Sequence, residues 1–293
     1  MVRVLIKLLL VVIVVLLSGL GLVSGAGVAG DIDNAAPLFN GGLAGMLSVL
    51  VMVPFMFVGF DVIPQSAEEI DLPFASIGKL LVMSILMAIV WYALVIAAVA
   101  MALPESERAL SSLPTADAAA ALFNDSWPGK LLVVGGVAGI LTSWNAFLIG
   151  GSRALYALAK AGQVPSAFAA LHPVYRTPHR AILLVGGFAV CAPLFGRPAM
   201  VWLVDAGGLG IVTAYAMVAL SFLVLRAKEP DMDRPYRVRY GRLVGYLAFM
   251  LSLALASLYL PWSPAALLWP HEWIIVISWC VLGLLFHWFS NAD

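Results

Sequence analysis

Residues 54–69 read PFMFVGFDVIPQSAEE, and this stretch decides how the rest of the chain is interpreted. Two prolines, a glycine and an aspartate interrupt an apolar run that otherwise predicts a membrane-spanning helix. An ionised Asp at the centre of a bilayer costs about 2.5 to 3.5 kcal/mol on insertion scales, so something must compensate it. Pro64 removes a backbone donor and crowds the carbonyl of Phe60, and Gly59 leaves helical dihedrals at little cost. We therefore predict that the helix unwinds near residues 58–62.

An unwound segment of this kind predicts a binding site. Exposed backbone at membrane depth is tolerated only where it is buried in protein or lines a water-filled cavity. Discontinuous helices form substrate and ion sites in secondary transporters, because their free N–H and C=O groups can bind charged groups of a solute. Phe55, Phe57 and Phe60 lie beside the predicted break and could wall a pocket or stack on a cation. The alternative is a simple proline kink in which Asp61 hydrogen-bonds to a neighbouring helix.

The composition excludes whole classes of protein. Hydrophobic residues make up 63% of the 293 and charged residues 11%, with a mean hydropathy of +1.02. Soluble domains carry about 25% charged residues, so a water-soluble fold is excluded. Sixteen basic and sixteen acidic residues cancel, which leaves no basic field for nucleic acid. Cys191 and Cys280 lie far apart in apolar runs and lack the spacing of a zinc site or a disulfide scaffold, so no metal or other cofactor is expected.

The apolar pattern predicts an all-α integral membrane protein. A transmembrane helix needs roughly 20 apolar residues, and about eight stretches approach that length. Arg3 and Lys7 before the first stretch also resemble a signal peptide, but its apolar run is long, which favours a retained helix. Residues 195–198 predict a tight hairpin between the fifth and sixth spans. The predicted spans are 8–29, 42–63, 76–103, 130–158, 181–196, 199–225, 243–261 and 273–289.

The distribution of Lys and Arg predicts the orientation. Eight spans place both termini on one side of the membrane, and cytoplasmic loops carry the excess of positive charge. Three basic residues fall on the opposite side, namely Arg108, Lys130 and Arg197. The side of the termini carries Arg3, Lys7, Lys79, Arg153, Lys160, Arg176, Arg180, Arg226, Lys228, Arg234, Arg237, Arg239 and Arg242. We therefore expect a multi-pass protein of the cytoplasmic membrane with both termini cytoplasmic.

Further polar groups lie inside the predicted spans. Thr142 and Ser143, in the middle of the fourth span, could coordinate a small cation or bond to a neighbouring helix. Lys7 could snorkel to the membrane interface or serve a function. The glycines of residues 205–210 favour close packing of helices over contact with a substrate. Residues 104–129 predict short helices over the outer face.

Four motifs along the chain together carry a family resemblance. The first is the interrupted helix described above. The second is SRALYALA at 152–159, with Gly162 and Pro165 shortly after it. The third is HPVYRTP at 172–178, and the fourth joins Leu225-Arg226 and Pro230 to RPYRV at 234–238. Each motif alone is loose, but in their order and spacing they resemble the C-terminal part of permeases of the amino acid, polyamine and organocation (APC) superfamily.

The resemblance implies a partial inverted-repeat, LeuT-like transporter fold. Family members usually have twelve helices, the first ten of which form two inverted five-helix repeats, so the spans here would correspond to helices five to twelve. Residues 1–30 would then be the last helix of the first repeat, 41–228 the second repeat, and 243–293 two peripheral helices. On this resemblance, the family's first four helices, including the broken first helix that binds the substrate carboxylate in the family, would have no counterpart in these residues.

The resemblance also implies roles for particular residues. Val58, Gly59, Phe60 and Asp61 would form the unwound segment that receives the substrate amine, with Asp61 coupling binding to gating. Phe55 would correspond to the aromatic gate. Lys7 would match a lysine that some proton-coupled members place where sodium-coupled relatives hold an ion, and Thr142 and Ser143 would match hydroxyls around the same spot.

The expected function is therefore secondary active transport of amino acids or related amines by alternating access, coupled to H⁺ or Na⁺. The expected partners are the lipid bilayer, a small amino acid or amine substrate, and a separately encoded N-terminal half. The alternative is a truncated or split-gene permease fragment without transport activity of its own. An enzyme is not expected, because His172, His179, His271 and His287 lie in loops or near membrane faces and form no catalytic arrangement.

Overall fold

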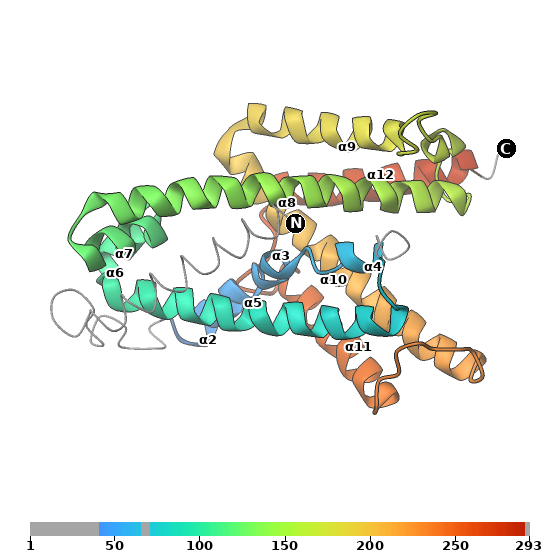
Figure 1. Cartoon of the computed structure of the whole chain (residues 1–293), viewed down its shortest axis with the longest axis horizontal. Helices are drawn as coiled ribbons and strands as arrows, with labels where there is room; N and C mark the ends of the chain where they lie inside the picture. Colours follow the sequence, from blue (N-terminus) through green and yellow to red (C-terminus); the bar gives the residue numbers. More distant parts are fainter. Residues whose placement is uncertain (1–40, 66–70, 291–293) are drawn as a thin grey trace. The chain divides into compact units, whose positions relative to one another are not determined.

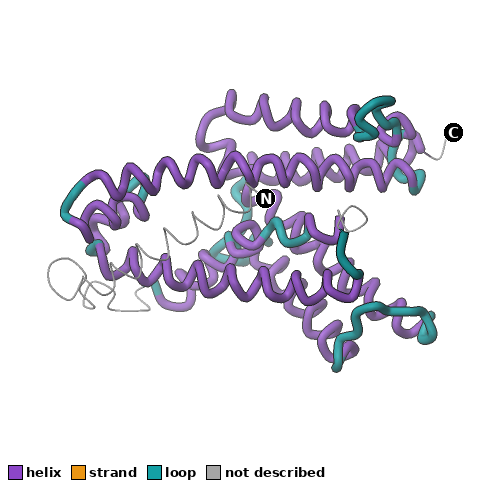
Figure 2. The backbone as a smooth tube through the Cα atoms, viewed as in Figure 1, coloured by secondary structure: helices purple, strands orange, loops and turns teal. Residues whose placement is uncertain are grey.

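The computed structural model describes residues 41–65 and 71–290, and these residues form helices and loops without a strand (Figures 1 and 2). Long apolar runs form helices because a helix satisfies every backbone hydrogen bond within one segment. The α-helices are α2 (Gly42–Leu50), α3 (Val53–Phe57), α4 (Val62–Gln65), α5 (Phe74–Ala102), α6 (Glu105–Leu110), α7 (Pro114–Phe123), α8 (Ser126–Lys160), α9 (His179–Cys191), α10 (Gly196–Lys228), α11 (Gly241–Leu258) and α12 (His271–Ser290). The described part of the chain also forms two 3₁₀ turns, η3 (Ser166–Ala169) and η4 (Ala192–Phe195).

Two compact units divide the chain. Among the described residues, the first unit holds Val82–Asn145, and the second holds residues 41–81 and Ala146 onward. The long helices α5 and α8 each contribute to both units. The predicted hydroxyl pair at 142–143 falls in the first unit, whereas the predicted break falls in the second.

Within residues 41–65 and 71–290, five helical segments are long and apolar enough to cross a membrane. They are Phe74–Ala102, Ser126–Lys160, His179–Lys228, Gly241–Leu258 and His271–Trp288. In α5 and α8 the most apolar stretch contains no buried residue, so both helices present apolar side chains outward, as helices in a lipid environment do. The chain is therefore a multi-pass membrane protein by its helices.

The predicted spans are found in part. The predicted first span, 8–29, lies outside the described residues. The predicted second span is divided into α2, α3 and α4. The fifth and sixth spans are α9 and α10 within the continuous segment His179–Lys228, and the chain turns between them at η4 and Gly196, whose φ of 77° favours glycine (Figure 1).

The first unit contains the two short helices that the sequence predicts between the third and fourth spans. Ala102 and Leu103 at the end of α5 pack against Ala118 of α7. Gly129 at the start of α8 lies so close to α7 that a Cβ there would come within 2.6 Å of the Ala116 carbonyl oxygen. The Arg108 guanidinium donates to the Ala100 carbonyl at 2.7 Å, which satisfies a free carbonyl at the end of α5.

The second unit is built around α10, which packs on α3, α11 and α12. Its apolar core contains Val51, Val212, Tyr259 and Leu267, of which Val212 and Tyr259 are 0% exposed. The Tyr259 hydroxyl passes Gly208 and donates to the Val51 carbonyl at 2.7 Å. This bond joins the loop after α11 to the turn between α2 and α3.

The close approach at Gly208 agrees with the packing interpretation of the glycines at 205–210. A Cβ at Gly208 would come within 3.1 Å of Tyr259 Cζ, whereas Gly207 and Gly210 have no such neighbour. The end of α8 meets α9 in a similar way, because Cβ positions at Gly151 and Gly186 would contact Val185 and Leu148 at 3.6 and 3.9 Å. Small residues thus let helices approach where the packing needs it.

Candidate functional site

The helix predicted to break does so at residues 58–61. The α3 helix ends at Phe57 and α4 begins at Val62, with turns between them. Val58 takes a φ of −57° and a ψ of 139°, and Gly59 has a φ of +124°. A side chain at position 59 would be strained by that φ even though no atom lies within 4 Å of its Cβ position. The glycine is therefore required by the backbone and not by packing.

A second, milder irregularity precedes the break. Pro54 lies in the first turn of α3, where its missing N–H is tolerated. Val51 and Met52 keep helical dihedrals between α2 and α3, and the Met52 amide donates to Val49 at 3.0 Å in a tighter turn. Residues 42–57 thus run as a nearly continuous helix up to the break.

The carbonyl groups of the break are partly used by the next turn. The amide of Val62 donates to Gly59 at 3.3 Å, and the amide of Ile63 donates to Phe60 at 3.1 Å. These three-residue turns replace the bond that Pro64 cannot make to Phe60. A carbonyl oxygen has two lone pairs, so Gly59 and Phe60 can each accept one further bond.

The Asp61 side chain forms a hydrogen bond to the backbone within the break. Its Oδ1 accepts a hydrogen bond of 2.8 Å from the Gly59 amide, two residues earlier. Asp side chains commonly bond to nearby backbone in this way, which stabilises non-helical turns. The side chain is half-buried. The carboxylate is therefore compensated by its own backbone, and within the described residues it makes no hydrogen bond to a neighbouring helix.

Aromatic side chains flank the break in two environments. Phe60 packs against Tyr215 of α10, with ring centroids 5.9 Å apart and planes tilted by 38°. Phe55 lies one turn earlier and is 44% exposed. The Tyr215 hydroxyl is buried and has no hydrogen-bond partner among the described residues. A buried hydroxyl without a partner is unusual, so it marks a position where a polar group could bind.

Tyr215 was not predicted as a site residue. It lies seven residues after Gly208, on the same stripe as the buried Val212 and Ala219. Positions i, i+4, i+7 and i+11 share one face of a helix. A tyrosine hydroxyl on the face of an apolar helix that packs against its neighbours was the feature of the sequence that could have identified Tyr215.

The other predicted site residues lie elsewhere. Thr142 donates its hydroxyl to the Gly139 carbonyl of its own helix at 2.8 Å, and Ser143 is exposed. Both line a cavity of about 830 Å³ in the first unit, beside Trp91 and Val95. Lys7 lies outside the described residues. The grouping of these three residues with the break stays a prediction.

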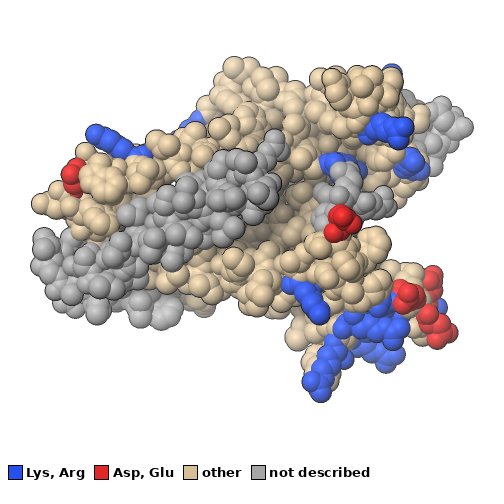
Figure 3. Space-filling model, in the orientation of Figure 1, with Lys and Arg blue, Asp and Glu red and all other residues tan. Residues whose placement is uncertain are grey.

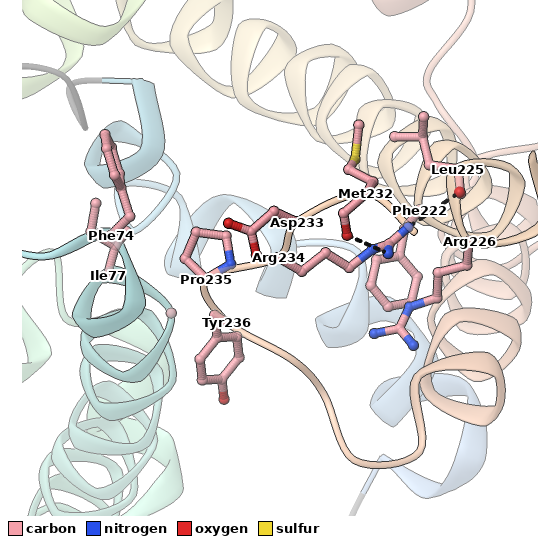
Figure 4. A pocket seen from close by; sticks show the side chains of 11 residues that line it. Phe74, Ile77, Phe222, Leu225, Arg226, Met232, Asp233, Arg234, Pro235 and Tyr236 are labelled. Atoms are coloured by element: carbon pink, nitrogen blue, oxygen red, sulfur yellow. Dashed lines mark hydrogen bonds between the residues drawn. The ribbon is translucent and has the colours of Figure 1, made fainter. Parts of the chain in front are cut away.

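A second cavity, of about 440 Å³, lies in the second unit where the start of α5 meets the end of α10 (Figure 4). Arg234 from the loop after α10 points back to the helix and donates to the carbonyls of Leu225, Glu229, Pro230 and Met232 at 2.6 to 3.3 Å. The Arg226 guanidinium lies 4.6 Å from the centroid of the Phe222 ring. These bonds close the free carbonyl end of α10, so the RPYR motif serves the fold here.

Charge gathers near this loop. Figure 3 shows Lys and Arg side chains around the segment that follows α10, with a few acidic side chains beside them, while uncharged residues cover most of the visible helices. The region 226–242 holds six basic residues and three acidic ones. Such a distribution is typical of a membrane protein, in which charges lie at helix ends and in loops.

Comparison with known proteins agrees with the membrane fold. A transporter is the class of protein that the membrane fold and the broken helix together define. The model of the amino acid permease family matches residues 1–289, so the chain belongs to the amino acid permease family, within the APC superfamily. The resemblance found in the sequence is thereby confirmed, and the family is one of transporters and not of enzymes.

Several curated proteins are similar to the chain. The branched-chain amino acid permease BcaP of Bacillus subtilis is 26% identical over 255 residues, which are 87% of this chain and 52% of that protein. The methylthioribose transporter of the same organism is 24% identical over 253 residues, 86% of this chain and 52% of that protein. The vacuolar cationic amino acid transporter 4 of Arabidopsis thaliana is 26% identical over 202 residues, 68% of this chain and 32% of that protein. The chain spans about half the length of the bacterial relatives.

Proposed function

We propose that the chain forms the C-terminal part of a permease that moves amino acids or related amines across the cytoplasmic membrane by alternating access. Membership of the amino acid permease family supports amino acid transport. The observation that carries the mechanism is the unwound segment at residues 58–61 inside an apolar stretch, because irregular backbone at membrane depth is retained where it lines a cavity. The break is the proposed substrate site.

The substrate amine sits against the break in this proposal. Its ammonium group donates to the carbonyls of Val58, Gly59 and Phe60, of which the last two keep one lone pair each. Phe55 and Phe60 pack the flanks of the substrate, and an aromatic face attracts a cation within about 6 Å of its centroid. The exposure of Phe55 supports a gating role, because its ring is not held by the core.

Asp61 couples binding to a cation. Its carboxylate accepts from the Gly59 amide at 2.8 Å, and hydrogen bonds to an ionised acceptor are stronger than those to a neutral one. Protonation of Asp61 would weaken this bond and loosen the turn that presents the carbonyls. Lys7, Thr142 and Ser143 are the further residues proposed for the H⁺ or Na⁺ site.

Tyr215 forms the opposite wall of the proposed site. Its ring contacts Phe60, and its buried hydroxyl has no partner within the described part of the chain. A polar substrate group that reached this hydroxyl would satisfy it. Substitution by Phe keeps the ring contact and removes only the hydroxyl, which makes Tyr215→Phe a specific test of this wall.

The finer architecture belongs to the same proposal. Eight spans, a helix at 1–30 from the first repeat, a second repeat at 41–228 and two peripheral helices at 243–293 give an inverted-repeat, LeuT-like transporter. Both termini lie in the cytoplasm. The names of the similar proteins include branched-chain amino acids, cationic amino acids and methylthioribose, which differ in charge, so we propose amino acids or amines as a class and not one compound.

The test replaces Asp61 in a reconstituted permease that contains this chain. We expect Asp61→Asn to lower amino acid uptake at least tenfold and to abolish its dependence on pH, because the amide can accept from Gly59 but cannot ionise. Glu107→Gln, at an exposed position of α6, is the matched control and should leave uptake unchanged. Unaltered uptake and pH dependence in Asp61→Asn would show that the coupling role is wrong.

The same assay separates the two functions predicted from the sequence. Uptake by vesicles that contain only these 293 residues would support transport by the chain itself. Uptake only when the family's first four helices are supplied would support a half that acts with a partner.

A further inference from the structure

The cavity at the end of α10 combines charged side chains with apolar walls. It measures about 440 Å³ and lies within the second unit (Figure 4). Its charged lining residues are Arg226, Arg234 and Asp233. Most of the other walls are apolar, namely Phe74, Ile77, Phe222, Leu225, Met232 and Pro235. Walls of both kinds fit a ligand that has a charged end and an apolar end.

Arg226 has a fixed position and an unsatisfied donor. Its guanidinium carbon lies 4.6 Å from the centroid of the Phe222 ring. The same group lies directly against Gly241 at the start of α11, where a Cβ would collide with it. The side chain is half-buried, and its Nε is buried without a hydrogen-bond partner among the described residues. A ring attracts the charge of a guanidinium but accepts few of its five N–H groups, so an anion is still needed.

The other two charged residues of the cavity do not supply that anion. Arg234 spends its own donors on four backbone carbonyls at 2.6 to 3.3 Å. Asp233 is exposed, and no ion pair joins it to Arg226. In Figure 4 Asp233 lies on the Phe74 side of the cavity, whereas Arg226 lies on the Phe222 side. Within the described part of the chain, Arg226 is therefore a cation without a partner acid.

The charge of the surrounding loop favours an anionic ligand. Residues 226–242 carry six basic and three acidic side chains, an excess of three positive charges, and Figure 3 shows them gathered at this end of the second unit. Basic pockets at the ends of membrane helices bind phosphate-bearing lipid headgroups. The planar fork of a guanidinium matches two phosphate oxygens at once, which an ammonium group cannot do.

An exposed apolar stripe leads away from the cavity along α10. Leu225 lines the cavity, and Val218 lies seven residues earlier on the same face of the helix. Both side chains are exposed, as is Phe74 at the start of α5. Acyl chains can cover such a stripe, whereas a free inorganic anion would gain nothing from it. The stripe therefore favours a lipid over a dissolved phosphate.

We propose that this cavity binds the headgroup of an anionic phospholipid. The phosphate accepts hydrogen bonds from Arg226, and the acyl chains lie on the apolar stripe that begins at Leu225. The ligand is one lipid at a defined site, beyond the general contact of the helices with the bilayer. The site lies at the end of α10 and not at the break, and it does not depend on the transport proposal.

Native mass spectrometry of the purified chain in detergent tests the site. The chain is titrated with dioleoyl phosphatidylglycerol and, separately, with dioleoyl phosphatidylcholine of the same acyl length. We expect one tightly bound phosphatidylglycerol and weaker binding of phosphatidylcholine, whose headgroup has no net charge. Arg226→Gln should weaken the binding of phosphatidylglycerol about tenfold, because a charge-assisted hydrogen bond is lost. Arg239→Gln removes the same charge from an exposed position of the loop and should leave the affinity unchanged.

A second variant keeps every charge and moves only the guanidinium. Gly241→Ala places a methyl group where the end of the Arg226 side chain now lies, and that flexible end can shift without unfolding the helix. We expect this variant to weaken the binding of phosphatidylglycerol as well. Gly283→Ala in α12, whose Cβ position has no neighbour within 4 Å, is its control and should bind the lipid normally. This pair keeps the test valid if Arg226→Gln fails to fold.

Three outcomes would overturn the proposal. Equal affinity for the two lipids would show that the cavity does not recognise an anion. Unaltered binding of phosphatidylglycerol by both Arg226→Gln and Gly241→Ala would place the lipid elsewhere on the chain. Displacement of the lipid by inorganic phosphate would show that the ligand is a free anion and not a lipid.

Discussion

Two glycines of the second unit serve opposite purposes. Gly59 has a φ of +124° and nothing within 4 Å of its Cβ position, so it bends the backbone into open space. Gly208 sits inside α10 and lies against Tyr259, so it makes room for a buried side chain. Gly59 allows the helix to unwind at residues 58–61. Gly208 leaves room for the Tyr259 side chain, whose hydroxyl donates a hydrogen bond to Val51 at the start of the same broken helix. One helix is thus held firmly seven residues before the point where it unwinds.

The two carboxylates of these regions differ in their exposure. Asp61 is half-buried and accepts from its own backbone at 2.8 Å, so the break is satisfied locally. Glu272 is 1% exposed, and its Oε2 accepts from the Leu268 amide, just before α12, at 2.6 Å. The comparison teaches that the break is a local structure with an accessible polar group, whereas the junction of α10 with Tyr259 and α12 is a tertiary one. The following predictions test this contrast, from the largest expected effect to the smallest.

Gly208→Ala should damage the junction most. The added Cβ would collide with the end of the Tyr259 side chain, which is fully buried and cannot move aside without losing its bond to Val51. Overpacking of this kind costs about 3 kcal/mol at its upper typical value. Thermal unfolding in detergent measures the loss. Gly207→Ala, in open space on the same helix, is the control and should not destabilise the chain.

Tyr259→Phe should weaken the same contact by removing the hydrogen bond to Val51, without introducing a steric clash. The variant keeps the ring and leaves the Val51 carbonyl without its 2.7 Å hydrogen bond. An unsatisfied buried acceptor costs about 1 to 3 kcal/mol, and we expect about 2 kcal/mol in the free energy of unfolding. Tyr246→Phe, an exposed tyrosine of α11, is the matched control. Equal stability of the two variants would show that the hydrogen bond from Tyr259 to Val51 does not stabilise the fold.

Gly59→Ala should act on the break and hardly on the junction. The φ of +124° is unfavourable for a side chain and costs about 1 to 3 kcal/mol. The segment is open, so the chain should remain folded while uptake by the permease falls about tenfold, the equivalent of about 1.4 kcal/mol. Gly283→Ala in α12, which also has no neighbour within 4 Å, should leave uptake intact. A loss of folding equal to that of Gly208→Ala would erase the contrast between the two glycines.

Thr142→Val should have the smallest effect on stability. The hydroxyl donates to Gly139 of its own helix at 2.8 Å and is partly exposed, so its removal should change the free energy of unfolding by less than about 0.5 kcal/mol. The proposed ion role predicts that the cation dependence of uptake nevertheless changes. An unchanged cation dependence would remove Thr142 from the proposed coupling site.

The sequence predicted the break because its causes are local. Pro64, Gly59 and Asp61 lie within six residues, and proline and glycine act on the backbone wherever the rest of the fold lies. The sequence also predicted the all-helical membrane fold and the short helices between the third and fourth spans. The prediction that the backbone carbonyls are freed holds only in part, since Val62 and Ile63 close tighter turns onto Gly59 and Phe60.

What the sequence by itself determined is where the chain enters an apolar environment and where its helix must stop, because apolar length and backbone geometry are properties of short segments. The tertiary structure alone decided that Tyr259 meets Val51 across 208 positions and that Tyr215 faces Phe60. Contacts between residues so far apart depend on how helices pack, and a single sequence carries no periodic signal for the identity of a partner on another helix.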